Sequence, residues 1–318
     1  MSSSDQQARV AFVTGAGGFL GGAVAAGLAA AGWKVAGLGH APRHPGDKTL
    51  PDFIEGEITR AALERAAVRV GSPNLVFHAA GGASVAASVE DPARDRQRTL
   101  GSLRQVLDYL RDEAPHARLI YPSSAAVYGD AGPGPIPETA PLKPVSPYGR
   151  HKLMAEDMIL EEHAARGLDA AIIRFFSAYG PGLRKQLFWE LAHRLAATPE
   201  TIELAGTGEE ERDFLYIDDA VALVRLISAQ APGAGPLIIN GGTGIAVSVR
   251  EAADELRAAM GANTGIQFSG ASREGDPKRL VANMSFASTV GFEPGTSLTD
   301  GIGAYGRWLV SERARSRA

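Results

Sequence analysis

Two residues spaced four apart, Tyr148 and Lys152, have the side chains needed for proton transfer. Ser146-Pro147 has the pattern of a helix N-cap followed by a first helical residue, so both side chains should lie on one face of a helix that begins there. The ordinary pKa of a tyrosine is near ~10, and a nearby ammonium and the positive end of a helix both favour the phenolate. The spacing therefore predicts that Tyr148 acts as a base near neutral pH, with Lys152 lowering its pKa.

A serine-containing loop precedes this pair in the sequence. Leu119-Ile-Tyr-Pro-Ser-Ser124 is typical of a buried strand that ends in a loop, and catalytic groups are usually found at the carboxyl ends of parallel strands. We expect Ser124 to hydrogen-bond the hydroxyl that Tyr148 deprotonates. The alternative is that Tyr148 is a surface residue packed on the stem of Lys152.

The first strand-like run, Arg9–Thr14, ends in a glycine-rich turn followed by a helical segment. Glycines at these intervals allow a tight turn and a close approach of backbone N–H groups to a pyrophosphate, and the helix N-terminus favours an anion. The turn predicts a dinucleotide site rather than a mere flexible connection. Its expected cofactor-binding residues are Gly15, Gly18, Phe19, Leu20 and Gly21. An oxidised nicotinamide bound there would also favour the Tyr148 phenolate.

The second strand, Lys34–Gly39, is not followed by the acidic residue that would bond the adenine ribose of NAD. His40 and Arg43 follow instead, and both could hold the 2′-phosphate of NADP, although they could also be loop cations without a ligand. The cofactor is therefore expected to be NAD or NADP, and these two residues favour NADP slightly.

Strand-length apolar runs alternate with longer helical segments through the first half of the chain, which predicts an α/β fold with a Rossmann-type, doubly wound parallel sheet. Shorter strands among helices follow, which predicts a smaller, mixed α/β carboxyl-terminal domain for the substrate. We expect the first domain over residues 1–176, with a return segment near 205–230, and mainly the substrate domain over 177–318. The first-half segments are Arg9–Thr14, Phe19–Gly32, Lys34–Gly39, Asn74–His78, Asp95–Asp112, Arg118–Pro122, Pro147–Arg166 and Ala170–Arg174.

Composition excludes several classes of function. The 318 residues include no cysteine, so disulfides, thiolate metal sites and a cysteine nucleophile are excluded, and no metal is expected. A net charge of −4 provides no general field for nucleic acid or an anionic membrane. Met1–Gln7 lacks the layout of a signal peptide, and no long apolar run follows, so we expect a cytoplasmic protein.

Two motifs together resemble one known family. Ser124-Ala-Ala-Val-Tyr-Gly129 and Tyr148-Gly-Arg-His-Lys152 resemble the UDP-galactose 4-epimerase branch of the extended short-chain dehydrogenase/reductases, the NAD-dependent epimerase/dehydratase type. The resemblance covers nearly the whole chain and implies that Ser124, Tyr148 and Lys152 are catalytic. Arg98-Thr99 departs from it, because family members often carry asparagine there. For the cofactor, the resemblance implies contacts from Glu57, Ile58, Ala79, Ala80 and Gly81.

The resemblance also implies a nucleotide-diphosphate sugar as the substrate. Arg212 before Asp-Phe, and Arg273, match positions at which the family binds the pyrophosphate, and guanidinium groups suit this task because they stay charged and donate in a planar fork. The alternative for each arginine is an exposed cation or a surface ion pair. The expected substrate-binding residues are Ser84, Ser124, Ala125, Ser177, Arg212 and Arg273.

Several reactions of this family begin with oxidation at the sugar C4, and the next step distinguishes them. Sugar dehydratases usually place a carboxylate just before Val-Tyr-Gly, where this chain has Ala125-Ala126, so dehydration is not expected. An epimerase that keeps its cofactor is our first hypothesis. An NADPH-dependent 4-keto-sugar reductase and a non-catalytic dinucleotide sensor or scaffold are the alternatives. We also expect a homodimer joined through the helices at Asp95–Asp112 and Pro147–Arg166.

Overall fold

The computed structural model describes residues 9–40, 50–197, 200–271 and 277–317. Arg43 and Arg273, both predicted to bind phosphate groups, therefore lie outside the described residues. The chain forms two compact units. The first comprises Met1–Val127, Ser146–Arg174 and Val221–Ile239, and the second comprises Tyr128–Val145, Phe175–Ala220 and Asn240–Ala318.

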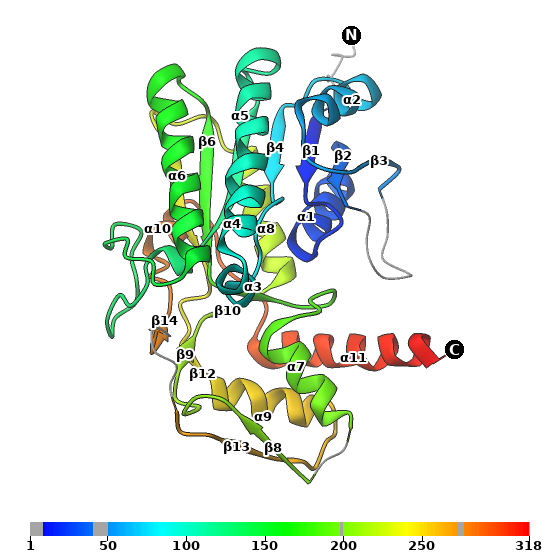
Figure 1. The fold of residues 1–318 in the computed structure, drawn as a ribbon, viewed down its shortest axis with the longest axis vertical. Helices are drawn as coiled ribbons and strands as arrows, with labels where there is room; N and C mark the ends of the chain where they lie inside the picture. The colour runs from blue at the N-terminus through cyan, green and yellow to red at the C-terminus, as the bar shows by residue number, and fades with distance from the viewer. Residues whose placement is uncertain (1–8, 41–49, 198–199, 272–276, 318) are drawn as a thin grey trace. The chain divides into compact units, whose positions relative to one another are not determined.

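A seven-stranded sheet forms the centre of the first unit, in the order β11-β6-β5-β4-β1-β2-β3 (Figure 1). β1 pairs in parallel with β2 and β4, β2 with β3, and β4 with β5. Parallel strands covered on both faces are continuous apolar runs, as in β1, whose five residues are all buried. The strands are β1 (Val10–Thr14), β2 (Lys34–Gly39), β3 (Asp52–Glu55), β4 (Leu75–His78), β5 (Arg118–Ser124), β6 (Ala170–Phe175) and β11 (Leu237–Gly241). The Rossmann-type prediction is confirmed.

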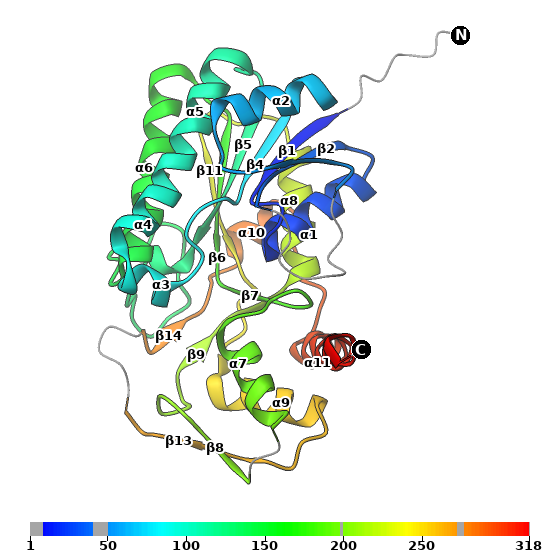
Figure 2. The same cartoon turned by 45° about the vertical axis from the view of Figure 1, so that its right-hand side comes forward.

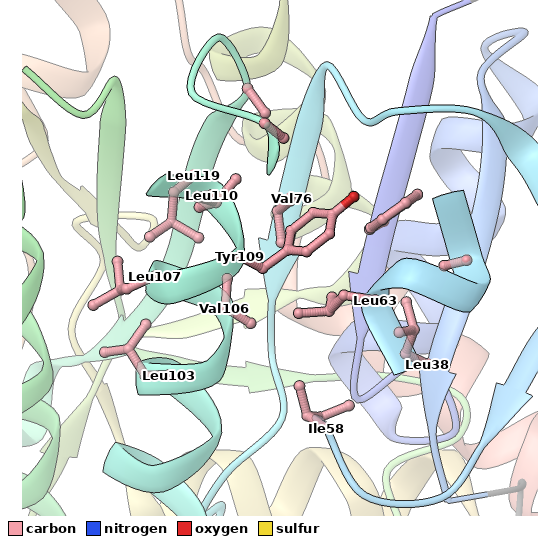
Figure 3. Close-up of a cluster of buried hydrophobic side chains, with 14 of the residues drawn as sticks. Leu38, Ile58, Leu63, Val76, Leu103, Val106, Leu107, Tyr109, Leu110 and Leu119 are labelled. Atoms are coloured by element: carbon pink, nitrogen blue, oxygen red, sulfur yellow. The ribbon is translucent and has the colours of Figure 1, made fainter. Parts of the chain in front are cut away.

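Helices cover both faces of this sheet (Figure 2). α2 (Arg60–Val70), α5 (Ser102–Glu113) and α6 (Pro147–Arg166) pack on one face, and α1 (Phe19–Ala30) and α8 (Ile217–Ala229) lie together on the other. On the first face, α5 turns Leu103, Val106 and Leu110 toward α2 and the strands, where all three are almost fully buried (Figure 3). This spacing is that of an amphipathic helix.

The helix predicted over Asp95–Asp112 is not continuous. It consists of α4 (Pro92–Arg96), a π-helical turn η1 (Gln97–Gly101) and α5, with the short helix α3 (Val85–Glu90) before them. The π turn directs the Thr99 side chain inward, where its Oγ1 accepts a hydrogen bond from the Gly82 N–H at 3.0 Å. The Ser102 hydroxyl donates to the Arg98 carbonyl at 2.6 Å. These side-chain bonds compete with the regular helical pattern and account for the break.

The second unit is mixed α/β, as predicted. Its paired strands are short: β10 pairs in parallel with β7, β13 with β8 and β14 with β9, while β12 is antiparallel to β9. The strands are β7 (Ser177–Tyr179), β8 (Thr201–Leu204), β9 (Glu211–Arg212), β10 (Phe214–Tyr216), β12 (Val247–Ser248), β13 (Gly265–Phe268) and β14 (Arg279–Leu280). The helices are α7 (Gln186–Leu195), α9 (Val249–Ala259), α10 (Ser285–Thr289) and α11 (Leu298–Arg317). None of the described helices of the chain has the length and apolar character needed to span a membrane.

Candidate active site

The first turn of α6 is held by side chains at each of its backbone positions. Ser146 is the N-cap, and its hydroxyl accepts from the Gly149 N–H at 3.1 Å, as the sequence predicted. Pro147 has no N–H to satisfy. The Tyr148 N–H donates to the Ser88 hydroxyl of α3 at 3.0 Å. Each of these three positions either has a hydrogen-bonded N–H or, at Pro147, has no N–H, so the backbone at Tyr148 is fixed. None of these amides is therefore available to a ligand.

The structure brings Ser124 and Tyr148 together. Ser124 ends β5, and its hydroxyl lies close enough to the Tyr148 phenol to lower the pKa of that phenol. The Ser124 hydroxyl accepts from the Ala126 N–H at 3.2 Å, within the turn η2 (Ala125–Val127). A strand end and a helix start thus place two hydroxyl groups close together.

Lys152 lies one turn after Tyr148 on α6 and is only 6% exposed. Its Nζ donates to the Pro122 carbonyl at 2.8 Å and is 5.8 Å from the centre of the Tyr148 ring. The same nitrogen is 4.7 Å from the centre of the Tyr121 ring, a cation–π distance. Two neighbours on β5 therefore fix the ammonium group beside the phenol.

The prediction for Tyr148 included the positive charge of an oxidised nicotinamide, so the pKa in the chain by itself does not test it. Burial raises the pKa of Tyr148 to about 12; the Ser124 hydrogen bond lowers it, and the Asp95 charge raises it further. Desolvation of the phenolate is the largest of these effects. Deprotonation near neutral pH therefore needs another positive charge.

The glycine turn before α1 has the shape that a dinucleotide requires. Gly15 has φ +68°, and a Cβ there would lie 2.7 Å from the Ala79 carbonyl carbon. A Cβ on Gly21 would lie 2.2 Å from the Gly15 carbonyl oxygen, so the helix packs directly on the turn. Gly18 is the N-cap and provides no side-chain acceptor. The amides of the first turn, at Phe19 and Leu20, thus suit a pyrophosphate, and the residues fit NAD.

The loop after β4 is tied to β1 and to the π turn. The Ala79 N–H donates to the Thr14 carbonyl and the Ala80 N–H to the Thr14 hydroxyl, both at 3.2 Å. Gly81 adopts φ +144°, a conformation that favours glycine. These contacts hold the backbone predicted to line the nicotinamide ribose. Thr99 supplies support from the position where we noted the absence of asparagine.

At the carboxyl end of β2, His40 Nε2 lies 3.4 Å from Glu57 Oε1, and both side chains are exposed. Ile58, next to Glu57, is buried. His40, which suggested a 2′-phosphate site, therefore has the Glu57 carboxylate beside it. Among the described residues, no group of three or more His, Asp and Glu side chains could hold a metal ion.

The other predicted substrate residues are placed as follows. Ser84 caps α3 and accepts from the Ala87 N–H at 3.4 Å, and Ala125 is buried. In the second unit, the Ser177 N–H donates to the Asp213 carbonyl at 2.9 Å, and the half-buried Arg212 donates to the Glu211 carbonyl at 2.9 Å. Their substrate roles stay predictions.

Asp213, between Arg212 and Phe214, has a structural role that the sequence reading did not assign. One carboxylate oxygen accepts from the Thr243 N–H and hydroxyl, both at 2.7 Å, and the other accepts from the Gly244 and Ala282 N–H groups at 2.8 and 3.1 Å. The bonds join three segments of the second unit and give Arg212 a rigid base. Thr14, Ser88, Asp95 and His151 were likewise missed near the predicted catalytic residues, because their partners are distant in sequence.

Comparison with known proteins points to one family. Residues 11–242 match the model of the NAD dependent epimerase/dehydratase family. A UDP-glucose 4-epimerase of Azospirillum brasilense is 30% identical over 311 residues, which cover 91% of this chain and 88% of that protein. The crystal structure of UDP-glucose 4-epimerase from Brucella ovis in complex with NAD is 29% identical, with a TM-score of 0.84 and coverage of 95% and 98%. TunA, an NAD-dependent NDP-hexosamine 5,6-dehydratase, is 28% identical, with a TM-score of 0.82 and coverage of 95% and 98%.

Proposed function

The chain belongs to the NAD dependent epimerase/dehydratase family, and from this premise we propose that it is an NAD-dependent nucleotide-sugar epimerase acting at the sugar C4. The observation that carries the proposal is the close pair of Ser124 and Tyr148, with Lys152 fixed one helical turn away in the same unit as the glycine turn. Relatives named UDP-glucose 4-epimerase support the choice of reaction.

In this mechanism Tyr148 accepts the proton of the C4 hydroxyl, while Ser124 hydrogen-bonds the same oxygen. Bound NAD supplies the hydride acceptor and later the hydride donor, and its positive ring provides the charge that favours a nearby phenolate. Lys152 keeps its ammonium group beside the phenol. After the 4-keto sugar presents its other face, Tyr148 returns the proton to the C4 oxygen. The protein binds, orients and moves one proton in each direction.

The structure of the Ser124 loop supports epimerisation rather than dehydration. Elimination of water from the ring needs a further acid or base close to the sugar, and a resemblance to a dehydratase of similar fold makes this a real alternative. Ala125 and Ala126 follow Ser124 in the turn η2, and neither side chain can transfer a proton. A 4-keto sugar formed here would therefore be reduced again rather than dehydrated.

We infer that the retained cofactor is NAD rather than NADP. The Glu57 carboxylate lies beside His40, so a 2′-phosphate placed there would meet a negative charge as well as a cation. Denaturing the purified protein and identifying the released dinucleotide by mass tests this directly. Retained NAD supports the epimerase. If the purified protein carries no dinucleotide and oxidises NADPH when a 4-keto sugar is added, it is a reductase. The absence of an acidic residue after β2 favours this alternative.

We propose UDP as the nucleotide and a hexose as the sugar, with Arg212 and Arg273 as the residues that bind the pyrophosphate. The test is incubation with UDP-glucose or UDP-galactose, followed by chromatographic separation of the two. Interconversion without added cofactor and without net change in nicotinamide absorbance is expected. If the protein binds NAD but does not turn over these sugar nucleotides, their N-acetylamino forms or their uronates, it is a non-catalytic dinucleotide sensor.

We also propose a cytoplasmic homodimer. Apolar side chains stay exposed on α3 and α6, namely Val85, Val89 and Met154, and they support an interface there. The leucines of α5 do not, because the core of the first unit already buries them. Light scattering during size-exclusion chromatography tests the proposal, and a monomer at micromolar concentration contradicts it.

A further inference from the structure

A buried pair of ionisable side chains lies next to the predicted base and is not used by the mechanism above. Asp95 of α4 is 6% exposed and His151 of α6 is 8% exposed. Their Oδ2 and Nδ1 atoms are 2.6 Å apart, a short hydrogen bond in which the imidazole donates to the carboxylate. Burying a carboxylate is costly unless it is paired, so a pair in this position needs an explanation.

The position of the pair relative to Tyr148 is fixed by the helix. His151 follows Tyr148 by three residues, so the two side chains lie on neighbouring positions of one face of α6. α3 and α4 pack against α6 there, and Ser88 of α3 holds the Tyr148 N–H. A change in the charge of the pair therefore acts on the phenol of Tyr148, whose pKa the Asp95 charge already raises.

Other ionisable groups near Tyr148 are neutral or have partners of their own; His78 of β4 is neutral, because burial lowers its pKa to about 3. Lys152 donates to the Pro122 carbonyl. Glu156, on the following turn of α6, is buried against Arg174 and accepts from its Nε at 3.2 Å and from its NH2 at 2.7 Å. The neighbouring phenol of β5, Tyr121, is itself uncharged, because burial raises its pKa well above the ordinary value. The arginines of α4 and the π turn, Arg94, Arg96 and Arg98, are exposed to solvent, which screens them.

What remains is the charge of Asp95, which adds to the effect of burial in raising the pKa of Tyr148. The hydrogen bond from His151 draws part of that negative charge toward the imidazole and away from the phenol. A carboxylate without this donor would oppose the phenolate more strongly, and a neutral amide in its place would oppose it less.

We propose that Asp95 and His151 are positioning residues that together set how readily Tyr148 gives up its proton. The inference rests on the proposed function, in which Tyr148 is the base. Neither residue needs to touch the sugar or the cofactor; both act through Tyr148. The pair thus gives this chain a means of adjusting the working pH range of its base without changing the base itself.

Three substitutions test the proposal through the pH dependence of kcat/KM, which reports the ionisation of the free enzyme's base. Asp95→Asn keeps the shape of the side chain and removes its charge. The acid limb of the profile, where kcat/KM rises with pH, should therefore move down by about one pH unit. His151→Ala removes the donor and leaves the carboxylate, so the limb should move up by roughly half a unit. His151→Asn restores an N–H donor and should bring the limb back toward the wild-type position.

A control distinguishes tuning from a general loss of structure. Asp157→Asn removes an exposed carboxylate from the same helix and should leave the acid limb in place. A purely structural role for the pair predicts lower kcat/KM in the Asp95 and His151 variants with no shift of the limb. Either that result, or shifts of Asp95→Asn and His151→Ala in the same direction, overturns the proposal.

A second measurement separates this inference from the proposed function. Tyrosine labelled with ¹³C at Cζ reports the ionisation of each phenol by NMR, and Tyr148→Phe identifies the signal of Tyr148 in the protein with NAD added. Opposite displacements of its titration in Asp95→Asn and His151→Ala support the pair even if no sugar nucleotide is turned over. An unmoved titration refutes the pair even if the enzyme is an active epimerase.

Discussion

Two helices of the first unit begin in opposite ways. The first turn of α6 has a serine cap, a proline and a second serine from α3, so each of its backbone positions is settled. The first turn of α1 begins at Gly18 without any side-chain cap. A helix N-terminus favours an anion only where its amides are still available. The first turn of α1 is therefore suited to bind phosphate, whereas the first turn of α6 fixes the position of the Tyr148 side chain.

The phenol on α6 is not acidic in the chain alone, because burial raises the pKa of Tyr148 to about 12. The open turn of α1 can bring in the missing positive charge, because it binds the dinucleotide that carries it. The turn before α1 thus binds the positively charged cofactor, and α6 holds the phenol whose ionisation that charge favours.

The largest expected effect comes from removing the group that α6 holds in place. Tyr148→Phe keeps the ring and its packing but removes the acid–base group, so kcat should fall by about 10²- to 10⁴-fold. NAD retention should be nearly unchanged, because the α1 turn is untouched. Steady-state kinetics and mass analysis of the released cofactor measure the two properties separately, and undiminished turnover in this variant would rule out Tyr148 as the base.

The next largest effect should come from closing the turn of α1. Gly21→Ala introduces a methyl group 2.2 Å from the Gly15 carbonyl oxygen, which must push the helix off the turn. We expect NAD affinity to fall by at least about tenfold, which corresponds to ~1.4 kcal/mol, as measured by isothermal titration calorimetry. Gly134→Ala is the control, because nothing lies within 4 Å of its added Cβ. Equal NAD affinity in the Gly21 variant and the control would show that the turn does not bind the dinucleotide.

Acid should weaken the support beneath the open turn. His78 is buried and its Nδ1 lies 2.7 Å from the hydroxyl of Thr14, the residue before Gly15. Burial, with a smaller contribution from the charge of Lys152, lowers the pKa of His78 to about 3. Between pH ~6.5 and that value the unfolded chain binds the extra proton, so the free energy of unfolding should fall with falling pH, by up to about 1.4 kcal/mol per unit.

Urea unfolding at a series of pH values measures this dependence. His78→Gln, which has no titrating group, should show a shallower slope over the same range. Identical slopes in the two proteins would mean that His78 does not stay neutral in the folded state.

The smaller of the two effects on kcat should come from opening the turn of α6. Ser88→Ala leaves the Tyr148 N–H without its partner and should cost ~1–3 kcal/mol of stability, together with a several-fold loss in kcat. Thr59→Ala is the matched control, because it removes the cap of α2, a helix that carries no predicted catalytic side chain. It should lower stability by about 1 kcal/mol and leave kcat unchanged. Equal kcat in both variants would show that fixing the Tyr148 backbone is not important.

What could be predicted from the sequence was local. The spacing of Tyr148 and Lys152, the Ser146 cap and the glycine turn each lie within one short segment, and the alternation of strands and helices gave the parallel sheet. Short strands were missed because two to four residues carry no periodic pattern, namely β3, β7, β9, β10, β12 and β14. The break in the helix at Thr99 depends on a partner in another loop.

The rest of the site depends on contacts between distant segments. Ser88 meets Tyr148 across 60 positions, and Asp95 meets His151 across 56. The effect of burial on the Tyr148 pKa was not foreseen for the same reason, since desolvation is a property of the packed structure and not of spacing. The carboxylate beside His40 comes from the segment after β3 and was not weighed against the preference for NADP.

The most direct test of the account follows the hydrogen at C4 of the sugar. A UDP-hexose that carries deuterium at C4 is incubated with the wild-type protein, and the epimeric product is analysed by mass and NMR. If the hydride is taken up and returned within one site while Tyr148 moves only the hydroxyl proton, the product keeps its deuterium at C4 and gains none from heavy water. Product that has exchanged this hydrogen with solvent, or the absence of any epimer, would contradict the account.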